Sequence, residues 1–145
     1  MNQDQFFSYT AEATSALGEA LSHRLQAGDL VTLSGSLGAG KTTFVQGVTR
    51  GLGIVTPATS PTFVLIIEHE GSTPLLHLDA YRLESKCFDA IRDAGVVDFL
   101  DREDAVKLVE WPERIADFLP SPQFAVTIDF GNADTERRIE IIESR

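Results

Sequence analysis

Residues 35–42 read Gly-Ser-Leu-Gly-Ala-Gly-Lys-Thr, which matches every fixed position of the phosphate-binding loop pattern G-x-x-x-x-G-K-[ST]. The glycines of such a loop let the backbone curl, so that its N–H groups point at a phosphate. Lys41 would reach the β- and γ-phosphates, and the hydroxyl of Thr42 would bind Mg²⁺. The predicted nucleotide contacts in this stretch are Gly35, Ser36, Leu37, Gly38, Ala39, Gly40, Lys41, Thr42 and Thr43.

The segments on either side of the loop are the ones that phosphate binding requires. Residues 30–33 form a short apolar run of strand-forming residues, and residues 43–50 carry apolar positions at helical spacing. A helix that begins at the loop adds unpaired N–H donors and the positive end of its dipole. The order of strand, turn and helix therefore favours a nucleotide site over a glycine-rich turn that contains Lys-Thr by chance.

Asp79 closes a second apolar run, residues 75–78. An apolar strand that ends in aspartate is the form of a Walker B element, whose carboxylate holds Mg²⁺ directly or through water. The alternative is an aspartate that caps a helix. His77 lies two residues earlier, so we expect it on the same face of the strand, half-buried rather than supporting the metal site. Arg82 would contact a phosphate or form a surface ion pair.

Glu110 ends a third apolar run, residues 105–109, and Trp111 follows it. The carboxyl end of a central strand is where α/β proteins place ligand chemistry, and Glu110 would orient or activate an attacking water there. The alternative is a carboxylate that caps the helix expected to start at Pro112. Trp111 would be a core residue, a wall of the nucleotide site or a partner contact. The predicted catalytic residues are Lys41, Asp79 and Glu110, and the predicted metal ligands are Thr42, Asp79 and Glu110.

Residues 56–63 contain two prolines among several hydroxyl side chains, which predicts a loop. The segment follows the helix after the phosphate loop, where nucleotide-binding proteins often keep a switch segment. Thr59, Ser60 and Thr62 would offer hydroxyls to Mg²⁺ or to the γ-phosphate, and Thr62 completes the predicted nucleotide contacts. The alternative is a plain connector.

The remaining patterns predict the elements that hold these stretches in place. Helices are expected over residues 10–26, 84–104 (one or two, with a break near Gly95) and 112–119, and strands over 63–69, 74–79, 124–130 and 137–143. Short turns between neighbouring strands make two antiparallel hairpins. The predicted fold class is α/β: a single P-loop NTPase-like domain over residues 1–145, with a mixed central sheet (parallel core, antiparallel hairpins) flanked by helices.

The composition limits which partners and which cellular compartment are expected. The 145 residues carry a formal net charge of −10, which argues against direct, tight binding to DNA or to another nucleic acid backbone. Cys87 is the only cysteine, so no internal disulfide is possible and a reducing compartment is expected. Neither a signal peptide nor a long apolar run is seen, which predicts a cytoplasmic protein without a membrane partner.

Four stretches together resemble the TsaE (YjeE) family of bacterial tRNA threonylcarbamoyladenosine synthesis. They are the phosphate loop with Thr43, then Ser60-Pro61-Thr62-Phe63, His77-Leu78-Asp79-Ala80-Tyr81-Arg82-Leu83 and Glu110-Trp111-Pro112-Glu113. The stretches occur in the family's order and span nearly the whole chain. One departure is Ala80, where the family more often has leucine.

The resemblance implies an ATPase that binds ATP/ADP with Mg²⁺ and hydrolyses ATP slowly. It implies that Lys41 and Thr42 bind phosphate and Mg²⁺, that Asp79 serves the metal, and that Glu110 supports hydrolysis. It also implies that Thr62 lies in a switch-like loop and Trp111 lies by the site. The implied partners are the TsaD and TsaB proteins, with tRNA reached indirectly through their complex.

Two other function classes remain open at this point. A phosphate loop serves phosphoryl transfer equally well, so one alternative is a small kinase acting on a small molecule or a protein. The other is a non-catalytic module whose binding depends on nucleotide. The chain lacks the N/T-K-x-D guanine motif and the L-S-G-G-Q signature, and little sequence remains for an acceptor domain.

Overall fold

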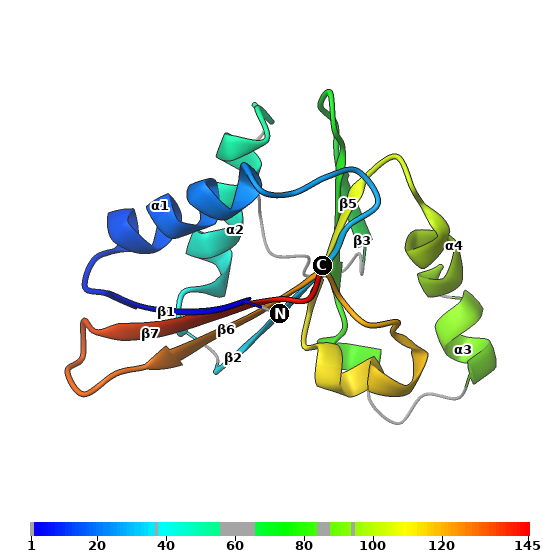
Figure 1. Cartoon of the computed structure of the whole chain (residues 1–145). Coiled ribbons are helices and arrows are strands. Elements are labelled where there is room, and N and C mark those ends of the chain that lie inside the picture. Colours follow the sequence, from blue (N-terminus) through cyan, green and yellow to red (C-terminus); the bar gives the residue numbers. More distant parts are fainter. Residues whose placement is uncertain (1, 37, 56–65, 84–87, 94) are drawn as a thin grey trace.

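The computed structural model describes residues 2–36, 38–55, 66–83, 88–93 and 95–145. Its centre is a seven-stranded sheet in the order β1-β7-β6-β2-β5-β4-β3 (Figure 1). The parallel strands are β2 (Leu30–Gly35), β4 (Leu75–Asp79), β5 (Val106–Glu110) and β6 (Phe124–Phe130). The antiparallel strands are β1 (Asn2–Ser8), β3 (Ile66–His69) and β7 (Arg137–Glu143). The predicted fold class, with a parallel core extended by antiparallel hairpins, is confirmed.

Helices cover the sheet on both faces and divide the core in two (Figure 1). On one face, α1 (Ala11–Ser22) and α2 (Lys41–Gly51) pack on side chains such as Val31 and Leu108. On the other, α3 (Phe88–Asp93), α4 (Val96–Asp101) and the 3-10 helix η2 (Pro112–Phe118) cover residues such as Leu30 and Val109. The short η1 (Tyr81–Leu83) follows β4. Neighbouring residues of one strand enter opposite cores because side chains alternate across a sheet.

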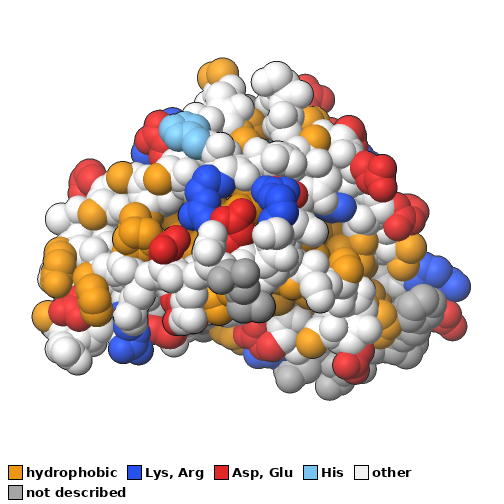
Figure 2. All heavy atoms as spheres, in the orientation of Figure 1, with side chains coloured by type: hydrophobic (Ala, Val, Ile, Leu, Met, Phe, Trp, Pro, Cys, Tyr) orange, Lys and Arg blue, Asp and Glu red, His pale blue; other side chains and the backbone are white. Residues whose placement is uncertain are grey.

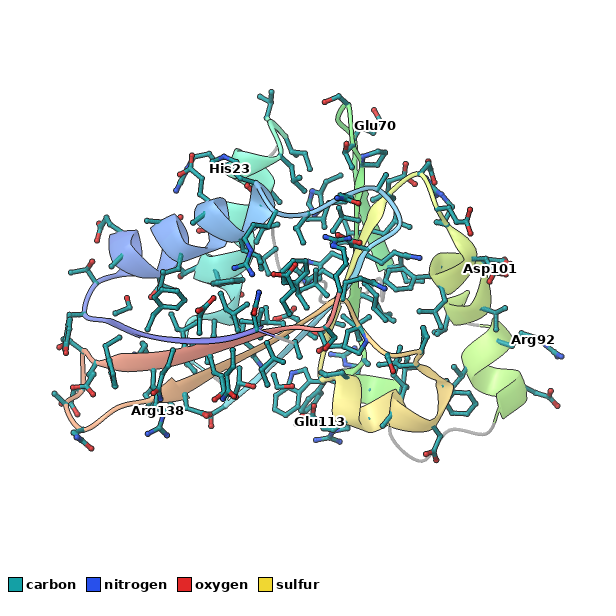
Figure 3. The ribbon with its side chains drawn as sticks, viewed as in Figure 1. His23, Glu70, Arg92, Asp101, Glu113 and Arg138 are labelled. Atoms are coloured by element: carbon teal, nitrogen blue, oxygen red, sulfur yellow. The ribbon has the colours of Figure 1, made fainter. Side chains whose placement is uncertain are left out.

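The structure differs from the sequence prediction in several elements. β1 is a strand that was not predicted; six of its seven residues are at least partly exposed, so pairing with β7 rather than burial defines it. The helix expected over 10–26 ends at Ser22, and exposed His23 follows it (Figure 3).

The segment expected as a helix over 112–119 is a 3-10 helix kinked at Ile115. Between α3 and α4, Gly95 has a φ of 90°, which explains the predicted break.

Within the described ranges, none of the helices combines the length and the apolar character that crossing a bilayer requires.

A charged cluster ties residue 145 to the loop before β2. The Arg145 guanidinium donates to both oxygens of Asp29, at 2.6 and 2.7 Å, and to the carbonyl of Arg24 at 2.9 Å. The Asp29 side chain is only 5% exposed and also accepts from the backbone N–H of Gln26. Arg24 is paired in turn with Glu143. On the face of the molecule that Figure 2 draws, basic side chains lie on either side of acidic ones near the middle.

We expect Arg145→Ala to lower the free energy of unfolding by about 1–2 kcal/mol, because among the described residues it leaves the nearly buried Asp29 carboxylate with only the Gln26 N–H as a donor. Thermal denaturation followed by circular dichroism measures the change. The control is Arg92→Ala, because Arg92 is exposed, pairs with exposed Asp89 and points away from the body of the molecule (Figure 3). Equal stability of the Arg145 variant and the wild type would contradict the prediction.

Candidate nucleotide-binding site

The predicted phosphate loop joins β2 to α2 with the backbone that its glycines permit. Gly35, Gly38 and Gly40 have φ values of 151°, 77° and 108°, a region that side chains disfavour. A Cβ added to Gly35 would also lie 2.1 Å from the carbonyl oxygen of Ile128 on β6. The loop therefore needs glycine at its first position for packing as well as for conformation. Leu37, a predicted contact, lies outside the described residues.

Lys41 is the first residue of α2 and folds back over the loop. Its Nζ donates to the carbonyl oxygen of Gly35 at 2.8 Å and lies 3.9 Å from the centre of the Trp111 ring. Burial lowers the pKa of Lys41, while the nearby carboxylates of Glu110 and Asp79 act in the opposite direction. Burial has the larger effect, so the carboxylates offset only part of the cost of holding the ammonium group beside the loop.

A cavity of about 410 Å³ brings the separate predicted stretches together. It is lined by Gly38, Gly40, Lys41, Thr42, Thr43, Asp79, Glu110 and Trp111. The reason is the sheet: β2, β5 and β4 are parallel neighbours, so their carboxyl ends meet at one edge, with Asp79 paired to Glu110 and Glu110 to Leu33. Predicted contacts Gly35 and Ser36 begin the loop that borders this cavity, and Ala39 is fully buried within it.

Asp79 caps the start of a short helix and also faces the cavity. Its Oδ1 accepts a hydrogen bond from the backbone N–H of Tyr81 at 3.0 Å, at the start of η1. The same side chain lines the cavity. Partial burial raises the pKa of the Asp79 carboxyl and nearby Glu110 adds to that effect, whereas the Tyr81 N–H lowers it. A cation bound here would offset the repulsion between the two carboxylates.

Glu110 and His77 form a buried pair beside the cavity. His77 Nε2 lies 2.7 Å from Glu110 Oε2, and the two residues are 1% and 4% exposed. The expectation of a half-buried His77 was wrong, because β4 has a strand on each side and a helical layer over this face. The spacing of two residues between His77 and Asp79 was the available sequence signal. It indicated that the two side chains share one face of β4, but it did not indicate how deeply His77 is buried.

Trp111 adopts a left-handed backbone that turns it toward the site. Among the described residues it is the one non-glycine with positive φ, at 57°. Such a conformation costs on the order of 1–3 kcal/mol and is retained where surrounding contacts enforce it. The ring meets Tyr81 edge-on at 5.0 Å between centres, and the Arg114 guanidinium lies 4.8 Å from the Tyr81 ring. Of the three roles considered for Trp111, the structure supports two, because the side chain lines the cavity and also packs against the core under η2.

A second cavity of about 300 Å³ adjoins the first and was not predicted. The two share Gly38, Gly40 and Thr43. Most of its remaining walls come from the β1–α1 turn with the start of α1, including Tyr9 and Thr10, and from the β6–β7 turn with Arg137, the first residue of β7. These turns are distant in sequence and carry no motif, so only the sheet order brings them to the phosphate loop.

The oxygen donors of the main cavity suit a magnesium ion. Thr42 offers a hydroxyl, and Asp79 and Glu110 offer carboxylates. Within the described ranges no group of three or more His, Cys, Asp or Glu side chains is placed to hold a metal. Mg²⁺ does not need such a cage, because it takes one or two carboxylates and fills its other positions with waters and substrate phosphates.

The predicted contacts from residues 59–62 and from Arg82 are the remaining ones to compare with the structure. Thr62, with Thr59 and Ser60, lies outside the described residues. Arg82 is exposed on η1.

A family model described as "Threonylcarbamoyl adenosine biosynthesis protein TsaE" matches residues 8–139. The chain belongs to the TsaE family. Relatives named "tRNA threonylcarbamoyladenosine biosynthesis protein TsaE" include one from a Nostoc species, 39% identical over 94% of this chain and 84% of its own length. Another, from Bacillus subtilis, is 38% identical over 96% of this chain and 85% of its own. The resemblance inferred from four short stretches is therefore confirmed.

A solved structure supports the same placement. The structure described as that of Bacillus subtilis YdiB superposes with a TM-score of 0.76 at 32% sequence identity, covering 99% of this chain and 87% of that one. The TsaE family is a P-loop ATPase-type family of the threonylcarbamoyladenosine pathway, so this chain is a protein of that tRNA modification pathway.

Proposed function

We propose that this TsaE family protein binds ATP with Mg²⁺, hydrolyses it, and couples the turnover to a TsaD–TsaB complex that transfers the threonylcarbamoyl group to tRNA. The observation that carries the proposal is the single cavity lined by Lys41, Thr42, Asp79 and Glu110. A phosphate-binding loop, a metal-binding carboxylate and a second carboxylate for the attacking water are the parts that hydrolysis of a γ-phosphate needs.

Each side chain has a task that follows from its position. Lys41 would exchange the Gly35 carbonyl for phosphate oxygens, a short movement that keeps its charge paired. Thr42 and Asp79 would hold Mg²⁺, which when bound neutralises charge on the β- and γ-phosphates. Glu110 would orient a water for attack on the γ-phosphate. The adjoining cavity shares Gly38, Gly40 and Thr43 with this one and would receive the nucleoside.

Membership of the family supports the proposed partners and compartment. Its pathway modifies tRNA, and a protein with net charge −10 is suited to docking on proteins while others contact the RNA backbone. We therefore place the protein in the cytoplasm, bound to TsaD and TsaB, with tRNA reached indirectly. DNA and membranes are not among the proposed partners.

We expect Glu110→Gln to lower kcat for ATP hydrolysis at least about 100-fold, because the amide no longer accepts a proton from the attacking water. ATP affinity should stay within about threefold, since Lys41 and the loop remain. Phosphate release measures the rate, with TsaD and TsaB present, and calorimetry measures binding. The matched control is Glu113→Gln, because Glu113 is exposed on neighbouring η2 (Figure 3).

The same assay separates the other function classes. Transfer of labelled γ-phosphate to an acceptor, in place of free phosphate, would show a kinase. If Glu110→Gln supported repeated tRNA modification as well as the wild type while Lys41→Ala did not, the protein would be a nucleotide-dependent binding module. Hydrolysis by Glu110→Gln at the wild-type rate would contradict the assigned role of Glu110.

A further inference from the structure

His77 is a fully buried polar residue on β4. Leu75, two residues earlier on the same face, and Leu108, its register partner on β5, are also fully buried. The titratable groups near His77 include Glu110, Asp79 and the buried His69. Because Asp79 pairs with Glu110, the Glu110 side chain lies diagonally across from His77 on the same face of the sheet. The only hydrogen bond of the His77 ring within the described residues is the one to Glu110.

Fold stability does not account for this pair. Burying a carboxylate and an imidazole costs desolvation energy, and apolar side chains of similar size in such a place are often neutral or stabilising. The surrounding strands already supply leucine and valine at equivalent positions. The ring also leaves Nδ1 buried without a partner among the described residues, which adds a further cost. The pair is therefore better explained by what it does to Glu110.

The contact assigns different roles to the two oxygens of Glu110. A carboxylate only accepts hydrogen bonds, so His77 carries its proton on Nε2 and donates it to Oε2. Within the part of the chain that the structure describes, no hydrogen bond is made to Oε1. With Oε2 held by His77, Oε1 is the oxygen available to a water or a metal-bound water in the cavity that Glu110 lines.

We propose that His77 is a positioning residue, which fixes the Glu110 carboxylate in the rotamer that serves hydrolysis. The inference rests on the proposed function, because it gives His77 its effect through the role of Glu110. A side chain anchored at one oxygen loses little freedom when the reaction begins, whereas an unanchored glutamate samples several rotamers. The substitution of His77 should therefore lower kcat and leave ATP binding unchanged.

The test compares variants that differ in reach. His77→Gln keeps an N–H donor near the position of Nε2, His77→Asn keeps the amide but is too short, and His77→Leu removes the donor. We expect Leu and Asn to lower kcat about 10- to 100-fold, as for other residues that orient an active group, with KM for ATP within twofold. The Gln variant should recover at least a third of the wild-type kcat. Thermal denaturation checks that each variant is folded.

A double-substitution cycle with Glu110→Gln separates this role from a structural one. If His77 acts through Glu110, adding His77→Leu or His77→Asn to Glu110→Gln should change kcat less than twofold. Four outcomes would each overturn the inference. The first is that the kcat losses of His77 and Glu110 substitutions multiply in the double variants, and the second is a wild-type kcat in the Leu and Asn variants. The others are an equal loss of kcat in the Gln and Asn variants, and a loss that lies in KM rather than in kcat. If His77→Leu does not fold, the Gln and Asn pair decides.

Failure of the proposed function would look different. A wild-type protein that hydrolyses no ATP with TsaD and TsaB present would overturn the proposed function and the inference together. A wild-type protein that hydrolyses ATP, with Glu110→Gln inactive and the His77 variants fully active, would overturn the inference alone.

Discussion

Lys41→Ala is expected to weaken ATP binding about tenfold to a hundredfold, since a charge-assisted hydrogen bond to phosphate contributes about 1.5–3 kcal/mol. Hydrolysis and repeated tRNA modification with TsaD and TsaB should be lost with it. Without nucleotide, Lys41 is only 7% exposed and its pKa is lowered by burial, so the folded protein holds this ammonium at a cost. We therefore expect the variant to melt no lower than the wild type.

Calorimetric titration with Mg·ATP measures the affinity, and thermal denaturation measures the stability. The matched control is Lys107→Ala: Lys107 is also nearly buried, also has a pKa lowered by burial, and donates to the carbonyl of Leu100 away from the cavity. This control should bind ATP like the wild type. Unchanged affinity in Lys41→Ala, or equal weakening in both lysine variants, would contradict the assigned role of Lys41.

Gly47→Ala is expected to cause the largest loss of stability. Gly47 lies where α2 crosses α1, and a Cβ there would be 1.9 Å from the backbone carbonyl oxygen of Ser15. The contact is reciprocal, because a Cβ on Gly18 of α1 would be 2.2 Å from the carbonyl oxygen of Phe44 on α2. Backbone atoms cannot rotate away, so the two helices would have to separate and the core beneath them would open.

We expect Gly47→Ala to lower the free energy of unfolding by about 3 kcal/mol or more. The midpoint of thermal denaturation should fall by about 10 °C. Helix propensity alone predicts the opposite sign, because alanine in a helix interior is favoured over glycine by about 1 kcal/mol. Gln46→Ala, at the exposed neighbouring position of α2, is the control and should change stability by less than about 0.5 kcal/mol. A stabilised Gly47→Ala protein would show that the helices are not packed this closely.

Much of the fold was predictable because its signals are local. The turn between β6 and β7 and the apolar run that becomes β5 follow from a few consecutive residues each. β1 was missed for the opposite reason: its largely polar segment is a strand because it pairs with β7, which is separated from it in sequence by residues 9–136. The 3-10 geometry of η2 likewise depends on packing around Ile115, which is 1% exposed.

The candidate site also has parts that local sequence patterns predicted and parts that they did not. Lys41, Asp79 and Glu110 were identified separately, Lys41 from the phosphate-loop pattern and the two carboxylates because each ends an apolar run. The structure places all three on one cavity. The adjoining cavity was not predicted, because Tyr9 and Arg137 have no motif and meet the loop only through the sheet order. The depth at which His77 lies was misjudged, because burial depends on the layers above a strand.

The sequence by itself was enough to predict a phosphate-binding loop at residues 35–42 and to identify the resemblance to the TsaE family, because both conclusions rest on residue types at fixed spacing. Only the tertiary structure decided that Lys41 lies over Trp111, that His77 holds Glu110, and that two glycines let α1 and α2 touch. These are contacts between segments far apart in the chain, and their distances follow from strand order and helix packing, which no local pattern encodes.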